Sequence, residues 1–378
     1  RVVLSTNSRI FYAGQSVAIT NHGDDSLTTG DMVHGAQSVG STVSFNPEQA
    51  FELSQIEIFE NIEGTPDVEV TLEKVLDGYP LMYHMATTGV TGTDASGIVA
   101  RSKERCDVRI GIFDEAANNV AAAAATNVAA GGVGAEVEIY CSGMYVSSVS
   151  YNIPVDGSST ESLTLVGNNK NWLTGANVKT TAAAVADFDG LDSPLALGVV
   201  HSPSGGVQRR EDVMIDACVL PVSIKGVVGT GVGNGVSAGT NLVHIQSIAI
   251  STDFSREDVL ELGNKNPYYR PAGFPVEVTC DIEAISTSGH FVSAYDAGDP
   301  TLFLTTASGN NTQEENIFIK LRAEIGFDLG TKNRLTSATY GGGDAGGGNV
   351  STRYSYSNFN SLDVQHHSHN NVGFQANP

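Results

Sequence analysis

A chain of 378 residues is long enough for two or three domains, each with its own hydrophobic core. Hydrophobic residues make up 40% of it and charged residues 16%, which excludes intrinsic disorder as the overall state. The formal net charge of −22 repels nucleic-acid phosphates and argues against specific DNA or RNA binding, although such a charge can also serve solubility alone.

Two further features bear on the compartment in which the chain folds. No run of about 18 apolar residues occurs, so no membrane-spanning helix is expected, and residues 1–15 lack the apolar centre of a signal peptide. The four cysteines are widely spaced, and Cys106, Cys141 and Cys280 lie in strand-like runs, where a free thiol behaves as a small hydrophobic side chain. We therefore expect folding in a reducing cytoplasm without disulfide bonds.

Strand-like alternation dominates the chain. In residues 66–76, Val68, Val70 and Leu72 alternate with acidic and hydroxyl side chains, as expected for a strand with one buried face. The same pattern predicts strands in seven later runs, which are 105–113, 135–143, 160–167, 241–251, 275–285, 315–327 and 349–359.

Helix signals are few. The alanine-rich run 115–130 is compatible with a helix or with a loop, because it has no large apolar face to dock. Residues 79–104 separate two predicted strands and are long for a hairpin connection. We expect this segment to contact a neighbouring molecule in an assembly.

An internal repeat is the most informative feature of the sequence. Residues 36–55 match residues 245–264 at an offset of 209, with Phe45 aligned to Phe254 and Leu53 to Leu262. After one deletion, the sequence VEVT at 68–71 recurs at 276–279. A repeat of this length predicts two tandem domains rather than a solenoid.

Each copy of the repeat is predicted to hold a short helical turn after its first strand. In the first copy Asn46 is a candidate N-cap, Pro47 suits the first helical position, and Gln49 completes a capping-box pattern. In the second copy Ser255 and Asp258 take the corresponding positions. Glycine- and alanine-rich stretches lie between the copies, and we place the first domain at 1–232 and the second at 233–378.

Three stretches, 147–172, 206–221 and 250–286, resemble the tail tube proteins of tailed bacteriophages. The resemblance implies an all-β fold in which each domain is a small β-sandwich or barrel with one short helix. It implies that subunits form rings whose strands join into one inner β-barrel, and that rings stack into a hollow tube through which DNA leaves the virion. The usual ring has six single-domain subunits, so a duplicated chain favours a trimer over a hexamer.

The resemblance also implies partners and a location. The chain would contact copies of itself, together with sheath, baseplate and tail-terminator proteins, and genomic DNA would pass without specific binding. It would be assembled in the cytoplasm of the host bacterium and reside in the virion tail. No cofactor and no membrane contact are implied.

Two groups of charged residues are candidate sites within such an assembly. The outward faces of the strands predicted at 66–76 and 275–285 either line the bore or are simply solvated, and their acidic residues are Glu69, Glu73, Glu277, Asp281 and Glu283. A compact cluster would form ion pairs between subunits or lie in a solvated loop, and it consists of Arg209, Arg210, Glu211 and Asp212.

Motifs for catalysis and for metal binding are weak. The glycines between 229 and 235 lack the lysine and the helix of a phosphate-binding loop, which favours a linker. Asp187, Asp189 and Asp192 do not follow the calcium-loop pattern, and a polar turn is the better interpretation. The histidines 366, 367 and 369 are interpreted as part of a flexible polar tail. We expect no catalytic residues, no metal and no enzymatic activity.

Two alternative functions remain open at this point. Another virion structural protein, such as a baseplate, connector or capsid-decorating protein, would form few rings rather than long tubes. A secreted β-rich adhesin or binding module would need an aromatic binding platform, whereas Trp172 is the sole tryptophan of the chain.

Overall fold

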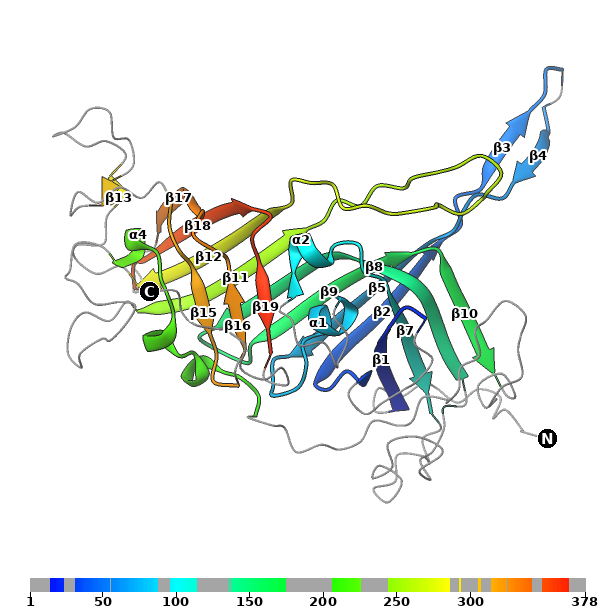
Figure 1. Ribbon diagram of the computed structural model, residues 1–378. Coiled ribbons are helices and arrows are strands. Elements are labelled where there is room, and N and C mark those ends of the chain that lie inside the picture. The colour runs from blue at the N-terminus through cyan, green and yellow to red at the C-terminus, as the bar shows by residue number, and fades with distance from the viewer. Residues whose placement is uncertain are drawn as a thin grey trace.

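The computed structural model describes the chain in segments separated by gaps. They are residues 14–23, 31–54, 56–87, 96–113, 135, 137–174, 206–225, 244–285, 292–293, 305–306, 314–323, 325–341 and 349–366. Antiparallel sheets make up most of these residues and the helices are short, which confirms the predicted all-β class (Figure 1).

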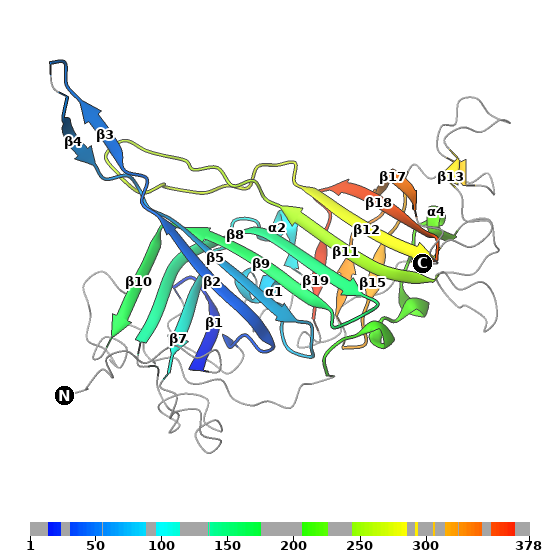
Figure 2. The same cartoon turned by 180° about the vertical axis from the view of Figure 1, so that it is seen from behind.

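The main sheet has eight strands in one continuous antiparallel path. From one edge to the other it contains β17 (Arg334–Gly341), β18 (Ser351–Phe359), β12 (Glu277–Ile285), β11 (Ile245–Asp253), β8 (Val137–Pro154), β9 (Thr160–Gly167), β5 (Asp67–Val75) and β2 (Ala36–Ser44). Along β5 the buried residues alternate with exposed ones, as the sequence pattern predicts. The view from behind in Figure 2 follows the whole path.

The long strand β8 belongs to two sheets. Its C-terminal part pairs with β9 and β11, whereas its N-terminal part pairs with β7 (Cys106–Ile112) and β10 (Asn169–Thr174). Strand β1 (Gln15–Asn21) extends this second sheet by pairing with β7. Buried side chains from both sheets contribute to one hydrophobic core.

A small third sheet packs over the part of the main sheet that contains β11 and β12 (Figure 1). Its order is β15 (Phe318–Lys320), β16 (Gly326–Asp328), β19 (Asp363–Gln365) and β6 (Ser96–Gly97). The prediction of one strand over 315–327 was therefore wrong in detail, because a turn at 322–323 divides this run into β15 and β16. Two isolated hairpins complete the strands, one of β3 (Glu48–Phe51) and β4 (Ile58–Ile62), the other of β13 (Val292–Ser293) and β14 (Thr305–Thr306).

Segment 206–225 pairs with the third sheet. Isolated bridges join Val213 to Leu321 and Val219 to Phe318 beside β15. The segment contains two 3-10 turns, η5 (Arg210–Asp212) and η6 (Ile215–Ala217), and the short helix α4 (Val222–Lys225). It was assigned to the predicted first domain, and Gln208 does bond to the backbone of Leu76 and Ser159 there, but from Val213 onward these bridges lead to the predicted second domain. The boundary after residue 232 falls outside the described residues and stays a prediction.

The segment 79–104, predicted to be a long connection that contacts a neighbour, is described at 79–87 and 96–104, and its first part is mostly buried. It forms helix α1 (Met82–Thr87), all of whose residues are buried, and the short helix α2 (Ile98–Arg101). In Figure 1, α1 lies on the same side of the main sheet as β15, β16 and β19. Since α1 is packed in the core of its own chain, the expected contact with a neighbour does not involve this helix.

Candidate assembly surfaces

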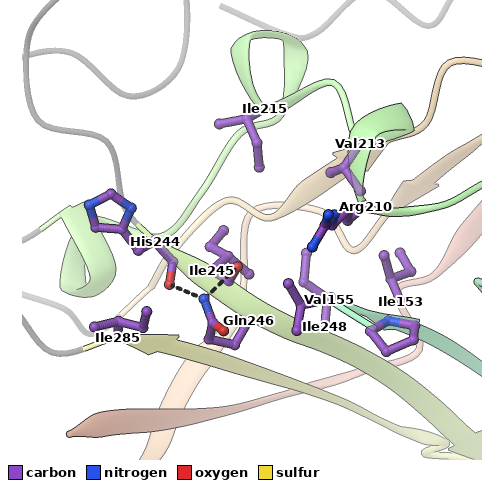
Figure 3. A pocket seen from close by; sticks show the side chains of 11 residues that line it. Ile153, Val155, Arg210, Val213, Ile215, His244, Ile245, Gln246, Ile248 and Ile285 are labelled. Atoms are coloured by element: carbon purple, nitrogen blue, oxygen red, sulfur yellow. Dashed lines mark hydrogen bonds between the residues drawn. The ribbon is translucent and has the colours of Figure 1, made fainter. Parts of the chain in front are cut away.

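The two copies of the sequence repeat form hairpins with the same irregularity. In the β2–β5 pair the register shifts between Ala36 and Ser38, and in the β11–β12 pair it shifts between Ile245 and Ser247. The side-chain amides of the two bulged residues, Gln37 and Gln246, donate to the carbonyls of the two preceding residues. Figure 3 shows this arrangement at Gln246. The outer strands β2 and β11 therefore correspond residue by residue at the predicted offset of 209.

The correspondence continues into the adjoining strands. The β8–β9 pair shifts register between Val146 and Ser148, and the β17–β18 pair shifts between Leu335 and Ser337. β8 thus corresponds to β17 at an offset of 189. On the inner strands the register aligns Glu73 with Glu283, which places the true match two residues away from the VEVT alignment. A shift of two residues preserves the face on which each side chain lies.

The predicted helical turns were wrong in both copies. Asn46 and Ser255 have φ values of 39° and 44°, which are left-handed rather than the extended conformation of an N-cap. Residues after Asn46 form β3, and those after Ser255 form an extended loop closed by a bridge. The Asn46 amide is also engaged elsewhere, because it donates to Asp67 over 2.8 Å.

The segment that follows β2 and the segment that follows β11 each begin and end at points where the backbone comes close to itself. A Cβ on Gly64 would lie 1.9 Å from the carbonyl oxygen of Asn46, and one on Gly273 would lie 3.0 Å from that of Ser255. At Gly64 only glycine fits without displacing the backbone, and at Gly273 a Cβ would make an unusually tight contact. We call residues 46–64 the first arm and residues 255–273 the second arm.

Both arms expose apolar side chains. Leu53 and the matching Leu262 are fully exposed. The other large apolar residues exposed on the arms are Phe51, Ile56, Ile58, Phe59, Ile62, Val259, Leu260 and Tyr268. Figure 1 shows β3 and β4 of the first arm projecting beyond the main sheet. Apolar surface concentrated on such projections is typical of contacts between proteins.

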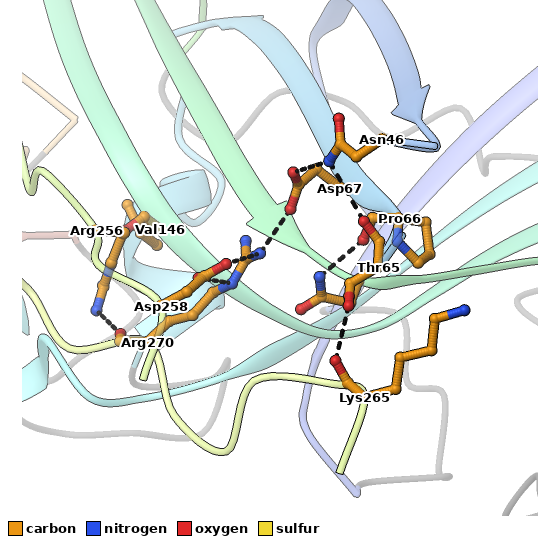
Figure 4. Close-up of polar contacts among 10 residues, drawn as sticks. Asn46, Thr65, Pro66, Asp67, Val146, Arg256, Asp258, Lys265 and Arg270 are labelled. Atoms are coloured by element: carbon orange, nitrogen blue, oxygen red, sulfur yellow. Dashed lines mark hydrogen bonds and ion pairs between the residues drawn. The ribbon is translucent and has the colours of Figure 1, made fainter. Parts of the chain in front are cut away.

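The second arm lies against the first half of its own chain. Arg270 forms ion pairs with Asp67 at 2.8 Å and with Asp258 at 2.6 Å (Figure 4). The Thr65 hydroxyl donates to the Lys265 carbonyl over 2.7 Å at the base of the first arm. These contacts hold the second arm across the base of the first.

The face of the main sheet opposite the core consists mostly of small hydroxyl residues and carboxylates. Seven carboxylates and two arginines lie on it within the described strands, the arginines being Arg334 and Arg353 and the carboxylates Asp67, Glu69, Glu73, Asp253, Glu277, Asp281 and Glu283. Ser and Thr of the same face occupy most of the remaining positions on β2, β8, β9, β11, β17 and β18. We call this surface the polar face.

All five predicted bore residues lie on the polar face. Glu69 and Glu277 are exposed, and Glu73, Asp281 and Glu283 are half-buried. Asp281 forms a 2.6 Å ion pair with Arg353, which offsets part of the negative charge on the second half. Whether this face lines a bore stays a prediction.

The predicted inter-subunit cluster separates into two kinds of residue. The carboxylate of Asp212 accepts a hydrogen bond from the Arg209 backbone N–H over 3.0 Å and lies 3.7 Å from Arg322, so it closes turn η5 within the chain. The side chains of Arg209, Arg210 and Glu211 are exposed. Their role between subunits stays a prediction.

The one pocket drawn in close-up is aliphatic. It has a volume of about 330 Å³ and is lined mainly by Ile, Val and Pro side chains, with Arg210 and His244 as its ionisable groups (Figure 3). Among the described residues, no group of three His, Cys, Asp or Glu side chains could hold a metal ion, and no helix is long and apolar enough to cross a membrane.

Other predictions concern residues near or beyond the described parts. His366 is buried, so its assignment to a flexible polar tail was wrong, while His367 and His369 lie outside the described residues. The runs 115–130, 187–192 and 229–235 also lie outside them. The four cysteines are buried free thiols, in agreement with the prediction, and burial raises the pKa of Cys141 to about 11.

A buried polar cluster that the sequence pattern did not reveal joins α1 to the main sheet. The carboxylate of Glu161 in β9 accepts hydrogen bonds from the backbone N–H groups of Met82 and Tyr83 at 2.7 and 3.0 Å, and from the Tyr151 hydroxyl at 3.1 Å. Lys74 is also fully buried and donates to Asp77 over 3.3 Å. Burial raises the pKa of Glu161, and the Lys74 ammonium opposes this effect.

Comparison with known proteins gives limited matches. No protein-family model and no curated protein matches the sequence. The cryo-EM structure of the anti-feeding prophage cap, described as a tube terminating cap, matches 46% of this chain and 95% of its own, at 14% identity and a TM-score of 0.30. The sheath–tube complex of PVC, an extracellular contractile injection system, in its extended state, matches 45% of this chain and 95% of its own, at 11% identity and a TM-score of 0.30.

Proposed function

We propose that this chain is a structural, non-enzymatic protein that assembles with copies of itself into stacked rings, forming the hollow tail tube of a bacteriophage. The observation that carries the proposal is the main sheet. Its eight strands end in two edges, β2 and β17, that pair on one side only within the described residues, and one face is mostly polar and acidic. Open sheet edges favour pairing with another chain, and ring closure satisfies all of them.

The matching halves support a ring built from duplicated subunits. The hairpins β2–β5 and β11–β12 share their bulges, and the two arms share their backbone turns. In this proposal three chains, each with eight strands on the path, close a sheet of 24 strands. Sheath, baseplate and tail-terminator proteins would then bind outside or at the ends of the tube, within the virion tail.

The assembly state of the purified chain is the direct test of this function. Negative-stain electron microscopy should show rings and long tubes of constant diameter. Isolated rings without tubes would favour a baseplate, connector or other virion role. A population of monomers at high concentration would contradict self-assembly altogether.

The polar face provides a prediction about DNA. In the tube it would line the bore, and its carboxylates would let DNA slide because they do not attract phosphates. We expect Glu69→Lys combined with Glu73→Lys to make the assembled protein retain DNA at least about tenfold more tightly at low salt, with retention lost as salt increases. Fluorescently labelled double-stranded DNA and a salt titration would measure this.

A charge-matched variant controls for net charge alone. Asp156→Lys with Glu314→Lys makes the same change of charge at exposed positions away from the face. It should leave retention as in the unmodified chain. Equal retention by both double variants would remove the acidic bore from the proposal, while ring formation would remain open to its own test.

The arms provide a prediction about stacking. In the proposed tube the exposed apolar side chains of the first arm contact the next ring. The triple change Phe51→Ser, Leu53→Ser and Phe59→Ser should leave folding stability within about 0.5 kcal/mol, because these side chains are exposed in the single chain. It should nevertheless stop growth at single or few rings, as seen by electron microscopy.

Polar substitutions on the same hairpin serve as the matched control. Glu52→Ser with Glu60→Ser changes exposed residues of the first arm without removing apolar surface. Tubes of normal length are expected from this variant. If the triple apolar variant also produces tubes of normal length, the first arm has no part in stacking.

A further inference from the structure

The junction between the two halves of the chain is itself a strand pair. β11 of the second half pairs with β8 of the first half over seven residue pairs, from Ser247↔Pro154 to Asp253↔Ser148. A backbone hydrogen bond from the Phe254 N–H to the Ser147 carbonyl, 2.8 Å long, extends it past the end of β11. This internal joint connects two corresponding four-stranded units within one sheet.

The two open edges correspond to the two sides of that joint. β2 is the counterpart of β11 at an offset of 209, since both carry the same bulge against their inner partner. β17 is the counterpart of β8 at an offset of 189, again with a shared bulge. The chain therefore carries both halves of a second joint that it cannot close by itself, because they lie at opposite ends of the path.

Burial of matching aromatic side chains differs between the joint and the edges. Phe254 is 0% exposed beside the internal joint, and its counterpart Phe45 at the β2 edge is 70% exposed. Tyr151 of β8 is 1% exposed, whereas its counterpart Tyr340 of β17 is 61% exposed. At each open edge, therefore, an aromatic side chain is exposed whose counterpart beside the internal joint is buried.

We infer that β2 of one chain pairs with β17 of a second copy of this chain, antiparallel and in the register of the internal joint. The pairs carried over from β11–β8 are Gly40↔Gly341, Ser41↔Tyr340, Thr42↔Thr339, Val43↔Ala338 and Ser44↔Ser337. The N–H of Phe45 donates to the carbonyl of Thr336 of that copy, as that of Phe254 does to Ser147. Phe45 and Tyr340 are covered when this joint forms.

A second copy is the occupant because its β17 edge is complementary to β2 and carries the bulge that β8 carries at the internal joint. The inference rests on the proposed self-assembly and names its contact. The inference specifies the register as well as the two edges. A slip of one residue would place the outward-facing Thr42 opposite Ala338 or Tyr340, which face inward.

Disulfide trapping in the full-length chain tests the register. Directly opposed residues have Cα atoms close enough for a disulfide, while a partner two residues further along lies near or beyond 7 Å, outside its geometric range. We expect Thr42→Cys with Thr339→Cys to form covalent oligomers on a non-reducing gel after mild oxidation, at least tenfold more than Thr42→Cys with Ser337→Cys. All three positions are exposed in the single chain, and the four natural cysteines are buried.

The outcomes separate this inference from the proposed function. Trapping by the Ser337→Cys pair instead, or rings by electron microscopy without trapping by either pair, would overturn the joint while leaving self-assembly intact. Absence of any oligomer by light scattering at high concentration would overturn both. In the unmodified chain, hydrogen exchange should show that the backbone amides of 40–45 and 336–341 that face the open edges become protected at least tenfold on assembly, and unchanged exchange of these amides would also overturn the joint.

Discussion

Replacing Phe254 by alanine is expected to lower the free energy of unfolding by about 3–5 kcal/mol, the range for a large aromatic side chain lost from a core. Its ring is fully buried, 6.3 Å from the ring of Tyr83 in α1 and 5.2 Å from the Arg256 guanidinium. The substitution therefore leaves a cavity at the internal joint. Urea denaturation of dilute, unassembled protein, followed by circular dichroism, measures the loss.

The matched variant is Phe45→Ala. Phe45 occupies the corresponding position but is largely exposed, so its loss should change the unfolding free energy by no more than about 0.5 kcal/mol. It should instead weaken self-association, because the joint between chains would cover this ring. A loss of stability as large as that of Phe254→Ala, with unchanged association, would show that Phe45 is a core residue and not part of an interface.

Replacing Glu161 by alanine is expected to cost about 3–5 kcal/mol, because it removes one partner from a buried charged cluster. The N–H groups of Met82 and Tyr83 would lose their acceptor, and the ammonium of Lys74 would lose a nearby negative charge. Since α1 begins at these N–H groups, the helix should detach before the sheet unfolds. Hydrogen exchange of residues 82–87 and urea denaturation together test this, and protection unchanged in α1 would contradict it.

The same carboxyl group makes stability depend on pH. Its pKa is raised above the ordinary 4.5 in the folded chain, so the unfolded chain releases the proton first as the pH rises. The free energy contributed by Glu161 is therefore highest below about 4.5, falls as the pH rises through the folded pKa, and is constant above it. Glu161→Gln lacks this titration. The stability of the unmodified chain relative to Glu161→Gln should decrease between pH 4 and pH 7, and an increase would contradict the raised pKa.

The strands could be predicted from sequence because their pattern is local. In β5, the alternation of Val68, Val70 and Leu72 with polar residues identifies both the strand and its buried face. The repeat was visible for the same reason, since Phe45 and Phe254 follow equivalent strands. What the sequence could not show is which edges remain open, because that depends on the pairing of β11 with β8, more than 90 residues away.

The arms show why a local motif can mislead. The pattern at Asn46, Pro47 and Gln49 suits a helix start, but capping is only one use of an asparagine side chain. Here the Asn46 amide bonds to Asp67 across the base of the arm, and β3 and β4 satisfy each other's backbone groups. The alternation in β9 places Glu161 on the same face as Leu163 and Leu165, but its partners in α1 lie about 80 residues away, and the local pattern could not show them.

The joint between β8 and β11 has a consequence for how such rings could form and diversify. In a ring of duplicated chains, half of the joints between four-stranded units would already lie within single chains. Fewer independent encounters are then needed, and the entropic cost of bringing free molecules together is lower. The two halves are also free to diverge. Arg270 holds the second arm to Asp67, whereas Asn61 occupies the matching position of the first arm. The two kinds of arm would alternate around such a ring, so the side chains on its outer wall would repeat three times rather than six.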